Sequence, residues 1–164
     1  MMNTSALDGT ARRLLGSTMM VATALLLFVS GCASTQESDA ATVKVMREAA
    51  EQGDMEAQFN LGLMYDNGQG VAENDVEAVR WYRKSAEQGD ANAQNNLGGM
   101  YYNGEGVVQN YTSAHMWMHL ARVQGHEDAR KNMKLLVEDM TKEQIAEAQK
   151  MASEWQAKHS SVSN

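Results

Sequence analysis

Three histidines carry the side chains in this sequence that are best suited to metal chemistry. His115 and His119 are four residues apart, so a helix would place both on one face, and His126 follows a few residues later. Two histidines at this spacing can bind zinc from a single helix. The glutamate of a His-Glu-x-x-His enzyme is missing, because Met116 occupies its position. We therefore expect no metal and no cofactor, and metal binding by His115 and His119 stays open as an alternative.

The other residues that could do chemistry match no catalytic pattern. No serine lies in a recognisable nucleophile elbow. The Gly-x-Gly sequences at residues 68–70 and 104–106 follow no strand and precede no lysine, so they indicate turns rather than phosphate-binding loops. Trp81, Trp117 and Trp155 recur at helical core positions, which favours packing over a ligand cage. We expect no catalytic residues.

An apolar segment lies near the start of the chain. It runs over residues 14–29 and is preceded by Arg12 and Arg13. The segment is shorter than the roughly 20 residues that a membrane-spanning helix needs. A basic start, a short apolar run and small residues at its end are typical of a secretory signal. We expect residues 1–31 to be a signal peptide.

Cys32 is the only cysteine of the chain and follows directly on that segment. The sequence Val-Ser-Gly-Cys at residues 29–32 resembles a bacterial lipobox, in which the cysteine is lipidated and becomes the new N-terminus. The alternative is a free thiol after ordinary cleavage. Ala33 rather than aspartate follows Cys32, and among lipoproteins this favours the outer membrane, facing the periplasm. Residues 32–42 are short and polar, as in a tether.

The charge balance excludes two classes of partner. The chain has 14 Lys plus Arg against 21 Asp plus Glu, a net charge of -7. Removal of residues 1–31 leaves 12 basic and 20 acidic residues, a net charge of -8. Nucleic-acid binding and adsorption to anionic membranes both need a basic face. We expect no nucleic-acid partner, and membrane association only through the lipid.

The chain repeats itself with a period of 36 residues. The sequence AEQGD occurs at residues 50–54 and again at residues 86–90. A fixed period of this length is typical of repeat architectures. The aligned pairs are Ala57 and Ala93, Leu61 and Leu97, Gly62 and Gly98, Tyr65 and Tyr101, Gly68 and Gly104, Gly70 and Gly106, Val71 and Val107, Ala78 and Ala114, and Trp81 and Trp117.

Each unit predicts two helices. In the first unit, apolar residues at i, i+4 and i+8 predict one helix over residues 55–65, and a second follows over residues 74–88. Asp54 is a suitable N-cap for the first helix, and Gly53 closes the helix before it. Gly62 lies inside the first helix at a cost of about 1 kcal/mol relative to alanine. Close approach of the second helix would offset that cost.

The third unit departs from the pattern. It begins at Ala129 in register but has no Gly-x-Gly turn. Instead, Thr141 and Gln144 are spaced as a capping box and predict the start of a last helix. A solenoid must cover the open face of its final repeat, so we expect this helix to be a cap. Its apolar stripe consists of Ile145, Ala148, Met151, Ala152 and Trp155.

The pattern Ala-x3-Leu-Gly-x2-Tyr-x2-Gly-x-Gly-Val followed by Ala-x2-Trp resembles the Sel1-like repeat family, relatives of tetratricopeptide repeats. The resemblance covers residues 43–158 and implies an all-α, right-handed superhelical solenoid of about seven helices in antiparallel pairs. The units then span about residues 50–85 and 86–121, a partial third repeat with the capping helix spans 122–158, and 159–164 form a tail.

The resemblance also implies where a partner would bind. In related superhelices the first helix of each pair lines the concave side. Phe59 and Leu63 would be exposed there beside acidic and amide side chains, which suits a protein or an extended peptide. The alternative is that both pack on the N-terminal helix. The predicted face consists of Glu56, Phe59, Leu63 and Asp66, with their register mates Asn92, Asn95, Gly99 and Tyr102, then Asp128, Lys131 and Leu135.

These observations predict a non-enzymatic protein- or peptide-binding adaptor of the bacterial cell envelope. The alternative is an envelope hydrolase, either β-lactamase-like or acting on peptidoglycan, or a metal-dependent enzyme. Some Sel1-like repeat proteins resemble β-lactamases, but that implication attaches to cysteine-rich members. This chain lacks those cysteines.

Overall fold

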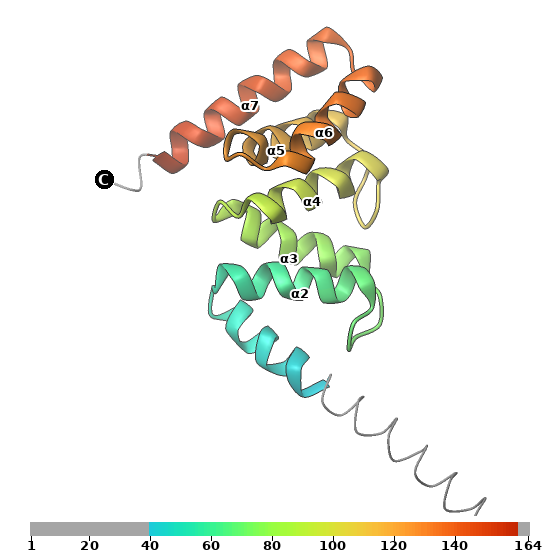
Figure 1. The fold of residues 1–164 in the computed structure, drawn as a ribbon, viewed down its shortest axis with the longest axis vertical. Coiled ribbons are helices and arrows are strands. Elements are labelled where there is room, and N and C mark those ends of the chain that lie inside the picture. The colour runs from blue at the N-terminus through green and yellow to red at the C-terminus, as the bar shows by residue number, and fades with distance from the viewer. Residues whose placement is uncertain (1–39, 161–164) are drawn as a thin grey trace, which may run out of the picture. The chain divides into compact units, whose positions relative to one another are not determined.

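The computed structural model describes residues 40–160, and Cys32 and the expected signal peptide lie outside them. Both copies of the 36-residue repeat lie in one compact unit, which begins at Thr42. The described residues form helices and no strand (Figure 1). One helix covers residues 40–51. The others are α2 (Met55–Asn67), α3 (Asp75–Glu87), α4 (Ala91–Asn103), α5 (Tyr111–Val123), α6 (Glu127–Leu136), the 3₁₀-helix η1 (Val137–Asp139) and α7 (Lys142–Ser160).

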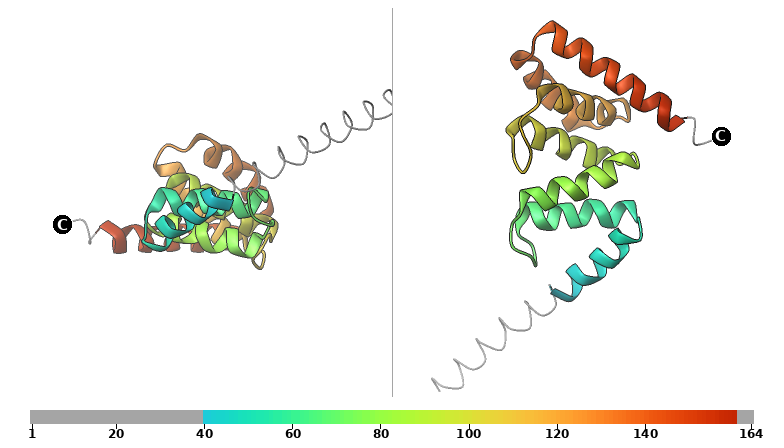
Figure 2. Two further views of the ribbon diagram at one scale, coloured as in Figure 1. Left: turned by 90° about the horizontal axis from the view of Figure 1, so that it is seen from below. Right: turned by 180° about the vertical axis from the view of Figure 1, so that it is seen from behind.

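The helices pack in chain order as a stack of pairs. Helix α2 pairs with α3, and α4 pairs with α5. Helix α3 also packs on α4, which joins one pair to the next, and α5 packs on both α6 and α7 (Figure 2). This arrangement confirms the predicted all-α solenoid of helix pairs with a C-terminal capping helix.

The sequence AEQGD forms the corner between successive pairs. In its second copy, Ala86 is fully buried at the end of α3. Gly89 has φ +103°, a conformation that favours glycine and lets the helix end in a tight turn. Asp90 Oδ1 then accepts a hydrogen bond of 2.8 Å from the Ala93 N–H and caps α4. The first copy repeats the cap, with 2.7 Å from Asp54 Oδ1 to the Ala57 nitrogen.

Buried glutamine side chains tie each corner to its neighbours. Gln58 is 4% exposed, and its Nε2 donates to the Ala50 carbonyl over 3.0 Å. Gln88, from the next corner along the chain, donates to Gln58 Oε1 over 2.7 Å. The same two bonds recur 36 residues later, from Gln94 to the Ala86 carbonyl (3.1 Å) and from Gln124 to Gln94 (2.9 Å).

Gly62 allows α3 to approach α2 closely. A Cβ atom at this position would lie 2.6 Å from Cδ1 of the Tyr82 ring, closer than van der Waals contact permits. Tyr82 is fully buried, and its hydroxyl donates to Asp66 Oδ2 over 2.8 Å. The cost of a glycine inside the helix is therefore offset by packing of an aromatic ring against the bare backbone.

Helix α7 closes the stack as predicted. Its capping box is present, because the Thr141 N–H donates to Gln144 Oε1 (2.9 Å) and the Gln144 N–H donates to Thr141 Oγ1 (3.2 Å). Trp155 meets Trp117 of α5 edge-on at 6.1 Å between ring centroids. The apolar stripe of α7 thus covers the outer side of α5.

The ends of the helical region differ from the prediction by a few residues. Residues 40–42, assigned to the tether, are already helical. Helix α7 continues through His159, whose ring stacks on Trp155 at 3.9 Å, so the predicted tail begins too early. Helix α2 also runs two residues beyond Tyr65, to the left-handed Gly68. Within residues 40–160, no helix combines the length and hydrophobicity needed to span a bilayer.

Truncation of either core tryptophan tests the equivalence of the two repeats. Trp81 is 2% exposed and Trp117 is 7% exposed, and both belong to hydrophobic core clusters. We expect Trp81→Ala and Trp117→Ala each to lower the free energy of unfolding by about 3–5 kcal/mol, as large buried aromatics do. Urea denaturation measures this. Val108, which is 86% exposed, supplies the control, and Val108→Ala should stay within about 0.5 kcal/mol of wild type.

Candidate binding face

The three histidines serve separate structural roles. His115 of α5 is 2% exposed, and its Nδ1 has no hydrogen-bond partner. Its ring stacks on His119 at 6.2 Å, and His119 Nδ1 lies 3.3 Å from the Arg122 guanidinium. His126 instead caps α6, because its Nδ1 accepts from the Ala129 N–H over 3.2 Å. Among residues 40–160, no three His, Cys, Asp or Glu side chains lie together as a metal site requires.

The two stacked histidines favour their neutral forms. Burial lowers the pKa of His115, and the neighbouring His119 and Arg122 lower it further. Burial also lowers the pKa of His119, with a second contribution from Arg122. His115 occupies the register position of buried Val79, so it fills an apolar position in the second repeat.

The predicted concave residues of α2, α4 and α6, from Glu56 to Leu135, are called the A-face. At its α2 end, Phe59 and Leu63 are partly buried and pack on the core cluster that contains Tyr82. The rings of Phe59 and Tyr82 lie 5.9 Å apart. Phe59 and Leu63 were both expected to be exposed, and that expectation is wrong; the cluster they pack on is the one with Tyr82 and not the one that contains Val43 and Ala50 of the N-terminal helix. Glu56 is exposed, and Asp66 accepts from Tyr82.

Hydrogen bonds join α4 to the third unit along the A-face. Asn132 Nδ2 donates to Asn95 Oδ1 over 3.1 Å. His126 Nε2 lies 3.2 Å from Asn92 Oδ1. Lys131 and Asp128 pair with each other over 2.9 Å at the exposed surface of α6. The structure thus brings the predicted residues of α4 and α6 into one continuous surface.

A groove of about 220 Å³ opens on this surface. Gly99 forms part of its wall, and a Cβ atom added there would meet nothing within 4 Å. Leu135, on the opposite side, is 62% exposed. The groove is lined by Gly99, Tyr102 and Asn103 of α4, Met118 of α5, and Asn132 and Leu135 of α6.

The sequence prediction found only half of this lining. It named Gly99, Tyr102 and Leu135. It missed three further residues of the lining, which are Asn103 of α4, Met118 of α5 and Asn132 of α6. The 36-residue register contains the missing signal, because Met118 aligns with the inward-facing Tyr82. A smaller side chain at an inward position leaves room between the helices.

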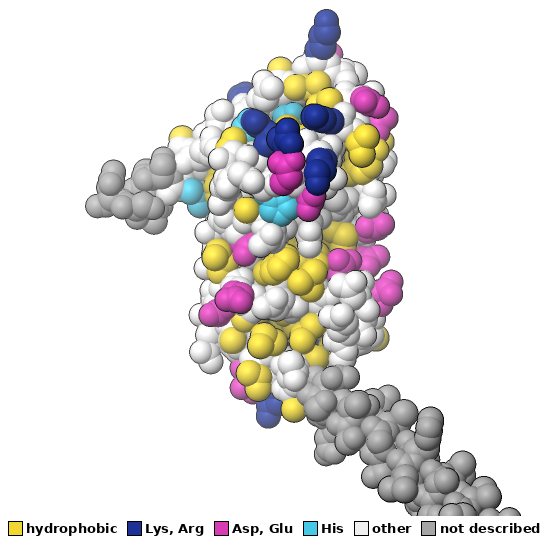
Figure 3. All heavy atoms as spheres, viewed as in Figure 1, with side chains coloured by type: hydrophobic (Ala, Val, Ile, Leu, Met, Phe, Trp, Pro, Cys, Tyr) yellow, Lys and Arg dark blue, Asp and Glu magenta, His cyan; other side chains and the backbone are white. Residues whose placement is uncertain are grey.

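Two carboxylates lie beside the groove. The Tyr102 hydroxyl donates to Asp139 Oδ2 over 2.8 Å. This hydrogen bond is the main reason why the pKa of Tyr102 is raised, and the charges of Asp139 and Glu138 add to it. In Figure 3, Lys and Arg side chains gather on the upper part of the molecule, at the level of α5 and α6. The basic residues of these helices are Arg122, Arg130, Lys131 and Lys134.

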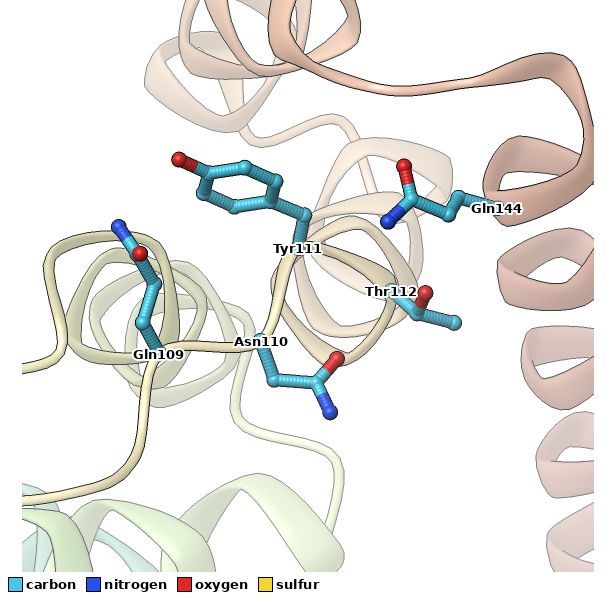
Figure 4. A pocket seen from close by; sticks show the side chains of 5 residues that line it. All are labelled: Gln109, Asn110, Tyr111, Thr112 and Gln144. Atoms are coloured by element: carbon cyan, nitrogen blue, oxygen red, sulfur yellow. The ribbon is translucent and has the colours of Figure 1, made fainter.

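A second hollow, of about 310 Å³, lies between the start of α5 and the start of α7 (Figure 4). Its amides are largely engaged. Asn110 Oδ1 accepts from the Ser113 N–H over 2.9 Å, and Gln144 belongs to the capping box of α7. Gln109 donates to the Tyr102 carbonyl over 2.7 Å. These side chains stabilise helix ends, so this hollow is a weaker candidate than the groove.

Comparison with known proteins identifies the repeat. The family model for the Sel1 repeat matches residues 56–90 and 91–126. The fold is similar to that of a protective antigen present in uropathogenic Escherichia coli strains, which displays an SLR fold, with 34% identity, a TM-score of 0.67, and coverage of 70% of this chain and 25% of that one. It is also similar to a Sel1 repeat protein from Oxalobacter formigenes, with 42% identity, a TM-score of 0.57, and coverage of 58% and 40%. None of the curated proteins matches this chain.

The adjacent glycines of α4 should respond in opposite ways to the same substitution. At Gly98, a Cβ atom would lie 2.6 Å from Met118 Cγ and 3.1 Å from the Ala114 carbonyl oxygen, whereas at Gly99 it would meet open space. We expect Gly98→Ala to destabilise the fold by overpacking, by about 1–3 kcal/mol. Gly99→Ala should stabilise it by up to about 1 kcal/mol, because alanine is the better helix former. Urea denaturation of both variants measures the difference, and a change of the same sign in both would contradict it.

The buried His115 should make stability depend on pH. Its pKa is lowered in the folded state. Its contribution to the free energy of unfolding is therefore complete above the unfolded pKa of about 6.5 and is lost as the pH falls through the folded pKa. His115→Val, which copies the first repeat, should reduce the loss of unfolding free energy between pH 7.5 and pH 5.5. Denaturation curves at both pH values test this. Equal losses in wild type and variant would show that His115 does not couple to folding.

Proposed function

This chain is a Sel1 repeat protein over residues 56–126, and we propose that it is a non-enzymatic adaptor that binds a partner protein through the A-face. The observation that carries the proposal is the groove between α4, α5 and α6. It offers an apolar floor and amide side chains on a surface that two repeats hold rigid. An extended segment of a partner can use such a combination, because the amides bond its backbone while the floor accepts a side chain.

The family supports the binding role. Sel1 repeat proteins are generally protein-interaction scaffolds without catalysis of their own. The chain spans 25% and 40% of the lengths of the two similar structures, so the relatives carry further segments that it does not match. The identity of the partner therefore has to come from the chemistry of this surface.

The proposed place of action is the cell envelope. Cys32 ends the lipobox-like sequence at residues 29–32, and the repeat domain begins a few residues after it. A lipid on Cys32 would hold the repeats at the outer membrane, facing the periplasm. Labelled palmitate should enter the wild-type chain and not Cys32→Ala, and unlabelled wild-type protein in the soluble periplasmic fraction would overturn the anchor.

An envelope hydrolase or a metal-dependent enzyme is the alternative function, and no observation in residues 40–160 favours it. The purified chain decides the question directly. Stoichiometric zinc would overturn the adaptor proposal. So would turnover of a β-lactam or a muropeptide that His115→Ala or His119→Ala abolishes.

Photo-crosslinking in intact cells tests the A-face. A photoreactive amino acid replaces Leu135 at the groove or, as a matched control, Val76 on α3; the two side chains are 62% and 63% exposed. We expect one discrete partner adduct from position 135 and little or none from position 76. Equal adducts from both positions, or an adduct from position 76 alone, would place the binding surface elsewhere.

A further inference from the structure

The two junctions between helix pairs have the same register but different fillings. At the first junction, Leu63 of α2 and the fully buried Tyr82 of α3 belong to the same core cluster as the buried residues of α4. The Tyr82 ring contacts Phe59 at 5.9 Å, and its hydroxyl reaches Asp66 at 2.8 Å. The chain thus fills this junction with its own large side chains.

At the second junction the three apolar residues Leu63, Tyr82 and Phe59 are replaced by smaller or more polar ones, whereas the larger Tyr102 stands at the position of Asp66. Gly99 stands at the position of Leu63, Met118 at that of Tyr82, and Asn95 at that of Phe59. Nothing lies within 4 Å of the place where a Cβ of Gly99 would be. The groove of about 220 Å³ is therefore the space that Leu63 and Tyr82 occupy one repeat earlier.

The surroundings of the groove define what could fill it. Its floor is the thioether side chain of Met118, and the exposed Leu135 forms an apolar wall, so a large apolar or aromatic side chain fits. Asn103 and Asn132 at the rim each donate one hydrogen bond within the chain, to Glu105 and Asn95, and their amide oxygens can accept from a peptide backbone.

The charge beside the groove is negative. Asp139 and Glu138 lie next to Tyr102 and form no ion pair within residues 40–160. Two basic side chains of α6, Arg130 and Lys131, are paired with Glu127 and Asp128, and Lys134 forms no ion pair with either carboxylate. A cation on the ligand would therefore meet two carboxylates at this end of the groove.

We propose that the groove binds a segment of a partner protein in which one large apolar side chain is followed directly by Lys or Arg. The apolar side chain enters beside Gly99 and rests on Met118, as Leu63 packs against the cluster that contains Tyr82 in the first repeat. The basic side chain lies against Glu138 and Asp139. This inference rests on the proposed binding role of the A-face and specifies its ligand, and it is independent of the anchor on Cys32.

Methyl NMR on the full chain in detergent micelles tests the proposal. The methionine methyl groups carry carbon-13, and Met118→Leu assigns the Met118 signal. The probe is acetyl-Gly-Phe-Lys-Gly-amide, with Ala in place of Phe or Glu in place of Lys as matched peptides. We expect the first peptide to shift the Met118 signal, and each of the other two to bind at least fivefold more weakly. Gly99→Leu should abolish the shift, whereas Val76→Leu, at an exposed residue of α3 that does not line the groove, should retain it.

Several results would overturn the proposal. They are an unshifted Met118 signal at millimolar Phe-Lys peptide, an equal response to the Ala or Glu peptide, and a response that survives Gly99→Leu. The crosslinking experiment at position 135 separates this failure from failure of the adaptor role. An adduct there without a peptide response would leave the adaptor and remove this ligand, and absence of both would remove both.

Discussion

The stack depends on amide side chains that are buried where successive pairs meet. Gln94 is fully buried, donates to the carbonyl at the end of α3 and accepts from Gln124. A buried amide without partners costs about 1–3 kcal/mol in proteins, so these bonds hold one geometry rather than a range of them. Gln58 makes the same bonds one repeat earlier, so the same contacts hold both corners. The regular spacing of the helices, and with it the groove, follows from this constraint.

Close packing between paired helices depends on a glycine in one helix that faces a large side chain of the other. Gly62 lets the Tyr82 ring lie on the backbone of α2, and Gly98 does the same for the Met118 side chain. The glycines allow the same close approach in both pairs, at 2.6 Å from the position of an added Cβ, while the residue facing them changes. The residue that faces the glycine can therefore change without a change in the packing of the helix pair. Where Met118 replaces Tyr82, a groove opens at the surface.

Much of the frame could be predicted from the sequence because local backbone physics dictates it. Asp90 and Gly89 occupy positions where a cap and a left-handed residue are required, and their residue types alone indicate both roles. The groove could be predicted only in part, because its floor comes from Met118, on a helix that the A-face pattern does not include. Phe59 was predicted to be exposed but is partly buried, since no local signal shows that a ring from α3 reaches it. The ends of α2 and α7 were predicted two residues too early, because polar residues continue both helices, whereas α3 was predicted one residue too long at each end.

The position of α7 determines how such a chain can grow. Helix α7 packs on α5 and so closes the last pair, which prevents addition of further repeats at that end. The corner sequence between pairs is identical at residues 50–54 and 86–90, so the chain could be lengthened there. A segment of 36 residues inserted between these corners would meet the same capping aspartate and the same buried glutamine at both of its joints. Duplication within the gene can therefore lengthen the protein by whole modules, and each added module brings its own surface for variation.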